Sequence, residues 1–164
     1  MKIGVVGLGV VGSAVFKGLE KLGHSMVGYD IKWPSTCTEL VGNELLKTKC
    51  LFICVPTNST ESGDCDVSNV DKVLWRLNYD RYEGLACIKS TVIPGTTDSF
   101  AQKYPDLRLA CVPEFLRANT AEEDFLSYHE LLVIGSHNST DVELVKQIHG
   151  SIPRNISVVE PTEA

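Results

Sequence analysis

The stretch KIGVVGLGVVGSAVFKGL (Lys2–Leu19) lies at the start of the chain and decides its fold. The segment Lys2–Val6 is apolar and β-branched after its first residue, which is typical of a buried strand. Three glycines follow in the spacing G-x-G-x-x-G, and a pattern typical of an amphipathic helix then covers Val11–Leu22. A strand, a glycine-rich turn and a helix in this order place unpaired backbone N–H groups at the helix N-terminus, where they attract an anion. The sequence therefore predicts a turn that binds phosphate rather than a turn of purely structural use.

An acidic residue stands where a dinucleotide-binding unit needs one. The second expected strand, Met26–Tyr29, is followed by Asp30, eighteen positions after Gly12. A carboxylate there accepts both ribose hydroxyls of adenosine and repels the 2′-phosphate of NADP, so the predicted cofactor is NAD. A structural turn with a solvated acid is the plain alternative, and a methyltransferase, which also has a glycine-rich turn and an acid after its second strand, is the main rival. The third glycine and its spacing favour a dinucleotide. The cofactor contacts expected in this part of the chain are Gly7, Gly9, Val10, Val11, Gly12, Asp30 and Lys32.

The rest of the chain alternates short apolar runs with helical patterns. This alternation predicts an α/β fold with a doubly wound parallel sheet, a Rossmann fold in a single domain. The polar, turn-rich loop Thr57–Asp66 is expected to be mobile. The expected strands after the second are Leu51–Val55, Leu85–Lys89, Leu109–Val112, Leu131–Ile134 and Ile156–Val159, and the expected helices after the first are Val67–Leu77, Gly95–Lys103 and Asp141–His149.

Composition narrows the classes of partner and site. A net charge of −6 argues against nucleic acid and against an anionic membrane, because both need a basic face. No apolar run approaches the roughly 20 residues of a membrane span, and the glycine-broken start is a poor signal peptide, so a cytoplasmic location is expected. No C-x-x-C occurs, and the four histidines are scattered, so no metal site is expected. Three cysteines lie in apolar runs and are expected to be buried, namely Cys54, Cys87 and Cys111, whereas Cys65 lies in the polar loop.

Three further segments narrow the family. They are FICVPTN (Phe52–Asn58), IKSTVIPGTT (Ile88–Thr97) and VPEFLRANTAEEDF (Val112–Phe125). Together with the N-terminus and LLVIG (Leu131–Gly135), they resemble the NAD-binding domain of the UDP-glucose/GDP-mannose dehydrogenase family over nearly the whole chain. The elements K-S-T-x-x-P-G and P-E-F-L-R in this order are far more specific than a single glycine motif.

The resemblance implies roles for residues that follow the expected strands. It implies that Thr91 helps to hold a catalytic water and that Glu114 contributes to the water and proton steps. From the residues alone, two alternatives stay open: Ser90 and Thr91 cap a helix, or Glu114 pairs only with Arg117. The resemblance adds these cofactor contacts to those above: Val55, Pro56, Thr57, Ser90 and Thr91.

The chain also departs from the family pattern. An acid follows P-E-F-L-R in the family, but this chain has Ala118; Asn58 replaces a proline; the connection from Asp30 to Leu51 is short; and HELL replaces an arginine before the strand Leu131–Ile134. The expected division is a NAD-binding domain over 1–160, with 161–164 matching the start of the family's central helix. The lysine and asparagine of that helix, and the nucleophilic cysteine beyond it, have no counterpart here.

This chain alone is therefore not expected to oxidise a nucleotide sugar. It is either the cofactor domain of a nucleotide-sugar dehydrogenase, whose catalytic half is supplied elsewhere, or a stand-alone NAD-binding module or relic with an interaction role. The identity of the sugar, homo-oligomerisation and association with a separate C-terminal chain all stay open.

Overall fold

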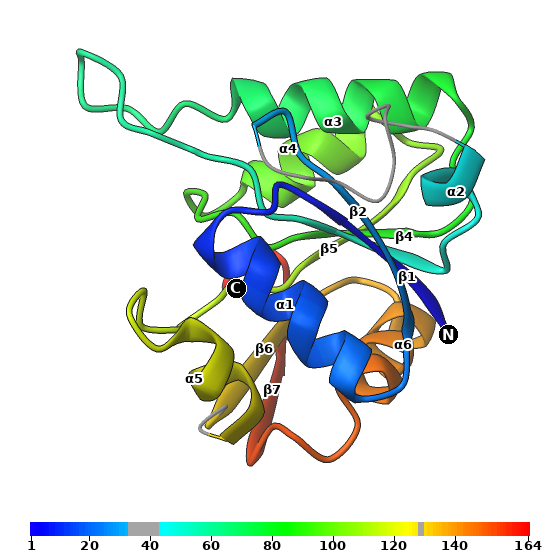
Figure 1. The fold of residues 1–164 in the computed structure, drawn as a ribbon. Coiled ribbons are helices and arrows are strands. Elements are labelled where there is room, and N and C mark those ends of the chain that lie inside the picture. The colour runs from blue at the N-terminus through cyan, green and yellow to red at the C-terminus, as the bar shows by residue number, and fades with distance from the viewer. Residues whose placement is uncertain (33–42, 128–129) are drawn as a thin grey trace.

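A seven-stranded sheet forms the centre of the computed structural model, which describes residues 1–32, 43–127 and 130–164 (Figure 1). The strand order is β2-β1-β3-β4-β5-β6-β7. The chain passes from β1 to one side for β2 and returns to the other side of β1 for β3, so the switch point of the sheet lies between β1 and β3. The strands are β1 (Lys2–Val6), β2 (Ser25–Tyr29), β3 (Cys50–Ile53), β4 (Leu85–Ile88), β5 (Arg108–Cys111), β6 (Leu131–Gly135) and β7 (Asn155–Val159).

Helices cover both faces of the sheet because alternate strand residues point to opposite sides. On β3, Phe52 packs in one core with α1, α5 and α6, whereas Leu51 and Ile53 pack in a second core with α2, α3 and α4 (Figure 1). The strands are apolar at successive positions for this reason. The helices are α1 (Val10–Lys21), α2 (Asn43–Leu46), α3 (Ser68–Tyr79), α4 (Thr96–Lys103), α5 (Ala121–Ser127) and α6 (Ser139–His149).

The predicted doubly wound α/β fold is confirmed, with one correction to strand direction. Strands β1 to β5 are parallel, but β6 pairs antiparallel with β5 through Cys111 and Gly135, and β7 runs parallel to β6. An apolar run does not encode the direction in which its strand enters a sheet. The short helices α2 and α5 were not predicted, because neither is long enough to show a helical period.

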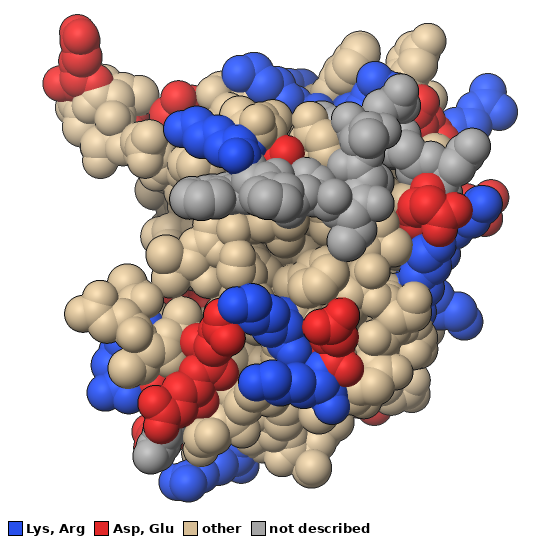
Figure 2. Space-filling model, viewed as in Figure 1, with Lys and Arg blue, Asp and Glu red and all other residues tan. Residues whose placement is uncertain are grey.

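Helices α1 and α5 lie in close contact because Gly18 has no side chain. A Cβ at Gly18 would come within 2.1 Å of the Phe125 ring, which fills this place in the core. Lys17 of α1 forms an ion pair with Glu122 of α5 across the outer edge of the contact. Basic and acidic side chains stand beside one another over these two helices (Figure 2).

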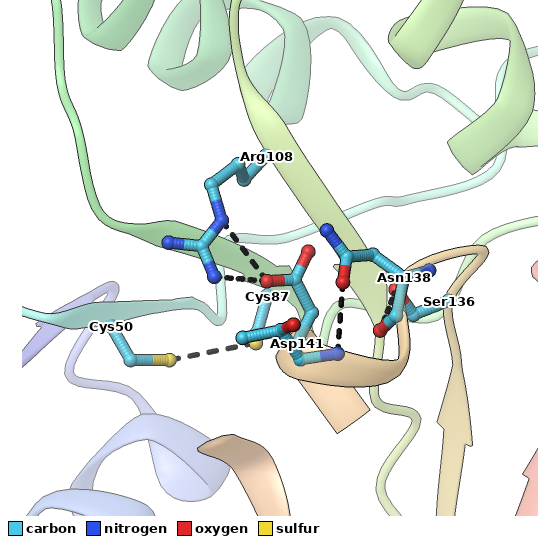
Figure 3. Close-up of polar contacts among 7 residues, drawn as sticks. Cys50, Cys87, Arg108, Ser136, Asn138 and Asp141 are labelled. Carbon is cyan, nitrogen blue, oxygen red and sulfur yellow. Dashed lines mark hydrogen bonds and ion pairs between the residues drawn. The ribbon is translucent and has the colours of Figure 1, made fainter. Parts of the chain in front are cut away.

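On the face of the sheet that α1 and α5 cover, side-chain contacts join the start of α6 to β5 (Figure 3). The Asn138 side chain accepts a hydrogen bond from the Thr140 backbone N–H at 2.8 Å and caps the helix. Asp141 in the first turn accepts a hydrogen bond from Arg108 Nε at 3.0 Å, and its side chain is buried. Beneath them, the Sγ atoms of Cys50 and Cys87 lie 3.5 Å apart as free thiols. Burial raises the pKa of Cys87 well above its ordinary value, so the pair is apolar core material.

Candidate functional site

The glycine-rich turn Gly7–Gly12, called the cradle below, connects β1 to α1 at the switch point of the sheet. Gly7 has φ +89°, a conformation that favours glycine, and its N–H donates to the Tyr29 carbonyl at 2.8 Å. At Gly12 a Cβ would lie 1.7 Å from the Gly7 carbonyl oxygen, so only glycine allows the helix to approach the turn. Both positions are therefore required by the local backbone.

Gly9, unlike Gly7 and Gly12, has open space beside it. A Cβ placed there would meet nothing within 4 Å, and the residue precedes the first turn of α1. It borders a cleft of about 570 Å³ between the cradle and the segment from Ala118 to Glu123, which leads into α5. Val10, at the mouth, is 55 % exposed, while Val11 packs against the core. The cradle thus has open space at the point where a phosphate would approach the backbone.

Asp30 is fixed at the end of β2, next to the cradle. Its Oδ2 accepts from the Leu8 N–H and its Oδ1 from the Lys32 N–H, each at 2.6 Å. A carboxylate accepts hydrogen bonds at both oxygens, as the two hydroxyls of a ribose require. Lys32 is exposed, and its backbone N–H is one of the two donors that hold the Asp30 carboxylate. The described residues therefore fit the phosphate and the ribose of a dinucleotide.

The structure also brings together the segments that follow β3 and β4. Ser90 Oγ donates to the Val55 carbonyl at 2.7 Å, and Thr57 Oγ1 donates to the Thr91 carbonyl at 2.6 Å. Ser90 is 7 % exposed, so its hydroxyl ties the two segments together from inside, whereas Thr91 is exposed. Helix α4 starts after Gly95 without a side-chain cap, so the alternative in which Ser90 or Thr91 caps that helix is wrong.

The polar loop Thr57–Asp66 folds back on itself as a short hairpin. Ser59 and Cys65 form a bridge, the Asp66 N–H donates to the Asn58 carbonyl at 2.9 Å, and the Thr60 N–H donates to the Asp64 carbonyl at 2.8 Å. The hairpin projects from the body of the domain beside α3 (Figure 1). At its base, the Asn69 side chain donates to the Pro56 carbonyl at 3.1 Å. Polar composition alone did not reveal this backbone pairing.

Glu114 follows β5 and pairs with a residue that the sequence analysis did not single out. Its Oε2 lies 2.7 Å from Lys89 Nζ, and the two side chains are 4 % and 0 % exposed. The alternative in which Glu114 pairs only with Arg117 is wrong, because Glu114 pairs with Lys89. Arg117 forms an ion pair with Asp124 at 2.6 Å. The hydrogen bonds from Arg117 hold the pKa of Asp124 below its ordinary value. In the sequence, Lys89 ends the expected strand Leu85–Lys89 and opens the K-S-T-x-x-P-G element, but neither feature indicates which residue it pairs with.

The cysteine next to the cradle is Cys54, which follows β3 and is partly buried rather than buried as expected. Desolvation of its thiol raises the pKa to about 12. Cys87 and Cys111 are buried as predicted, and Cys65 is partly buried with its thiol 3.7 Å from the Thr91 carbonyl oxygen. Cys37, His129 and residues 33–42 of the short connection after Asp30 lie outside the described residues.

His137 lies between two carboxylates. Its Nε2 is 2.9 Å from Asp98 Oδ1, and its Nδ1 is 2.7 Å from Glu160 Oε2. A neutral imidazole has one donor nitrogen, so only the protonated ring donates to both acids. The hydrogen bond to Asp98, together with Glu160, raises the pKa of His137. This contact joins the start of α4 to the segment after β7.

We expect His137 to stabilise the domain more in acid than in alkali. A raised folded pKa gives stability that is fully present below the unfolded value of about 6.5 and is lost as the pH rises through the folded pKa. Urea unfolding of wild type and His137→Gln should show a larger difference in the free energy of unfolding at pH 5.5 than at pH 8.5. Asp98→Asn should reduce that pH dependence. An equal difference in the free energy of unfolding between wild type and His137→Gln at both pH values would contradict this role of His137.

Metal binding and membrane insertion find no support in the described residues. Among the described residues, no group of three or more His, Cys, Asp or Glu side chains is placed to hold a metal ion. Across the same ranges, no helix has both the length and the apolar character needed to cross a membrane.

The sheet, its switch point and the cradle define a dinucleotide-binding domain of the Rossmann class. A family model described as the UDP-glucose/GDP-mannose dehydrogenase family, NAD binding domain, matches residues 35–152. The chain belongs to this family, and it is the NAD-binding domain of the family. NAD is accordingly its cofactor.

Proteins similar to this chain in sequence or structure support its assignment to this family. The chain is 36 % identical to a UDP-glucose 6-dehydrogenase of Rickettsia felis over 123 residues, which cover 70 % of this chain and 27 % of the relative. It is 27 % identical to a GDP-mannose 6-dehydrogenase of Pseudomonas syringae, covering 98 % of this chain and 47 % of the relative. The structure of a UDP-glucose dehydrogenase from Pyrobaculum islandicum matches with a TM-score of 0.87 at 25 % identity, covering 99 % of this chain and 46 % of that one. The chain thus spans between about a quarter and a half of the length of these relatives.

Proposed function

We propose that this chain binds NAD across the switch point between β1 and β3 and supplies the cofactor site of a nucleotide-sugar dehydrogenase. The observation that supports this most directly is the pairing of an open position at Gly9 with a fixed carboxylate at Asp30. The cradle N–H groups bind the pyrophosphate, and Asp30 accepts the adenosine ribose hydroxyls. The remaining proposed contacts are Val10, Val11, Lys32, Val55, Pro56, Thr57, Ser90 and Thr91.

Thr91 and Glu114 are the proposed catalytic residues. When bound, NAD supplies the acceptor for hydride from a substrate alcohol. The exposed Thr91 orients a water molecule, and the Glu114 carboxylate, which is paired with Lys89, accepts the proton that this water releases. Glu114 also lines a cavity of about 730 Å³ with residues of the loop after β5, and this cavity would receive the sugar end of the substrate. A nucleotide sugar is the proposed substrate class once the catalytic half is supplied elsewhere.

Calorimetric titration with NADH, NADPH and S-adenosylmethionine tests the proposed cofactor site. Wild type should bind NADH in preference to the other two. Asp30→Ala should weaken NADH binding by roughly tenfold to a hundredfold, because charge-assisted hydrogen bonds of about 1.5–3 kcal/mol are lost, and it should narrow the preference over NADPH.

The exposed acid Glu20 on α1 provides a matched control, and Glu20→Ala should leave both affinities unchanged. Equal NADH affinity of wild type and Asp30→Ala would remove Asp30 from the site. If the chain bound none of the three ligands, the proposed cofactor site would be overturned. The alternative of a stand-alone module or relic with an interaction role would then be favoured.

A further inference from the structure

A buried ion pair lies at the edge of the sheet that carries the cradle. Lys89 follows β4 and Glu114 follows β5, so both lie at the carboxyl ends of parallel strands. Lys89 Nζ also lies 3.3 Å from the Val112 carbonyl oxygen and 5.8 Å from the centre of the Phe52 ring. Glu114 Oε1 accepts from the Phe115 N–H at 3.0 Å. Both charges are thus held in place by groups of the protein.

The pair is electrostatically close to the cradle. Cys54 connects the two, because a Cβ on Gly12 would lie 3.3 Å from the Cβ of Cys54. The Lys89 backbone N–H donates to the Ile53 carbonyl at 2.9 Å, directly before Cys54 in the chain. Burial raises the pKa of the Cys54 thiol, and to a lesser extent Lys89 lowers this pKa and Glu114 raises it, so both charges act at this position. Water and salt screen buried charges only weakly. Removal of either partner would therefore leave a net charge whose field reaches the cofactor site.

Placing two charges in the interior is costly and is not by itself a source of stability. Apolar residues of similar volume would fill the same space at less cost in desolvation. The surroundings of the pair suggest a use for it, because Glu114 lines the 730 Å³ cavity while the Lys89 side chain is fully covered. The Glu114 carboxylate is therefore the partner that faces the proposed substrate cavity, and the buried Lys89 ammonium group neutralises its charge.

We propose that Lys89 is a positioning residue that acts through Glu114 and sets the relative affinity of this site for oxidised and reduced NAD. This inference rests on the proposed function, because it requires the cofactor to bind at this edge. The nicotinamide ring of NAD⁺ is positively charged and that of NADH is neutral. An uncompensated carboxylate favours NAD⁺, an uncompensated ammonium group favours NADH, and the intact pair keeps the two in balance.

Separate dissociation constants for NAD⁺ and NADH test the proposal without any turnover. In Lys89→Met, the ratio Kd(NAD⁺)/Kd(NADH) should fall, by roughly tenfold, because the uncompensated carboxylate attracts the positive nicotinamide ring through a medium of effective dielectric near 20. In Glu114→Gln, the same ratio should rise by a similar factor. Each tenfold change corresponds to about 30 mV in the potential of the bound couple.

The conditions keep the remaining partner charged, because an unpaired buried acid or amine tends to become neutral. Lys89→Met is measured at pH 8.5 and Glu114→Gln at pH 6.5, with wild type at both. The double variant Lys89→Met/Glu114→Gln should return the ratio to near the wild-type value. Lys146→Met breaks an exposed ion pair with Glu143 and should leave the ratio unchanged.

Opposite shifts in the two single variants would support the proposal, since a purely structural role changes both dissociation constants in the same direction. If Lys89→Met does not fold, Glu114→Gln alone decides, and an unchanged or lowered ratio there overturns the proposal. Unchanged ratios in variants that bind both forms would overturn it and leave the proposed function intact. Absence of binding by wild type would overturn both.

Discussion

Lys89→Met is expected to lower the free energy of unfolding by about 3–5 kcal/mol, the cost of leaving one member of a buried ion pair without its partner. Methionine has a similar length and fills the space beside Phe52, so the loss reports on charge rather than on a cavity. The Glu114 carboxylate would remain almost wholly covered and would have to become neutral or draw in water. Urea denaturation measures the change.

The double variant Lys89→Met/Glu114→Leu is expected to regain most of this loss, because an apolar pair of similar volume avoids the cost of desolvating two charges. Lys146→Met, whose ion pair with Glu143 is exposed, should change stability by no more than about 1 kcal/mol. A double variant that is as unstable as Lys89→Met would show that packing around the lysine stem, and not its charge, is what matters.

Substitutions at two glycines of the cradle are expected to separate folding from binding. In Gly12→Ala, the new Cβ would meet the Gly7 carbonyl oxygen at 1.7 Å, and backbone cannot move aside as a flexible side chain would. The expected cost is about 3 kcal/mol, the upper end of ordinary overpacking. NADH binding should be lost with it.

Gly9→Val has free space for its side chain and an extended backbone that any residue adopts. Its stability should fall by less than about 1 kcal/mol, the usual effect at a helix N-cap. NADH affinity should nevertheless fall roughly a hundredfold, because the side chain blocks charge-assisted hydrogen bonds to the phosphates. Thermal denaturation and calorimetry of the two variants give the comparison, and normal NADH binding by Gly9→Val would place the pyrophosphate elsewhere.

The sequence was sufficient for features that depend on local chemistry. The cradle was predictable because a tight turn and a close helix contact both require glycine. In the structure, Gly7 has the positive φ of the turn and Gly12 lies at the close helix contact. The strands were predictable because burial on both faces leaves continuous apolar runs. Ser90 and Thr57 were predicted at the same edge, and the structure joins their segments through hydrogen bonds.

Features that depend on distant residues were not predictable. Nothing near Glu114 in the sequence indicates Lys89 as its partner, whereas the nearby Arg117 was an obvious but wrong alternative. The two nitrogens of His137 meet acids that lie 39 and 23 positions away along the chain, so the sequence around His137 does not indicate these contacts. Charges that pair across strands become visible only when the sheet is assembled.

The reversal of direction between β5 and β6 also leaves a seam in the sheet with little backbone pairing. The two strands are paired at Cys111 and Gly135, whereas β6 and β7 are paired along five positions. Helix α6 nevertheless packs across this seam, in the same core as Phe52 and α1. The ion pairs of Arg108 with Asp141 and of His137 with Asp98 also join its two sides. The seam is therefore held by side chains rather than by backbone hydrogen bonds, so the last two strands communicate with the proposed cofactor site through the core.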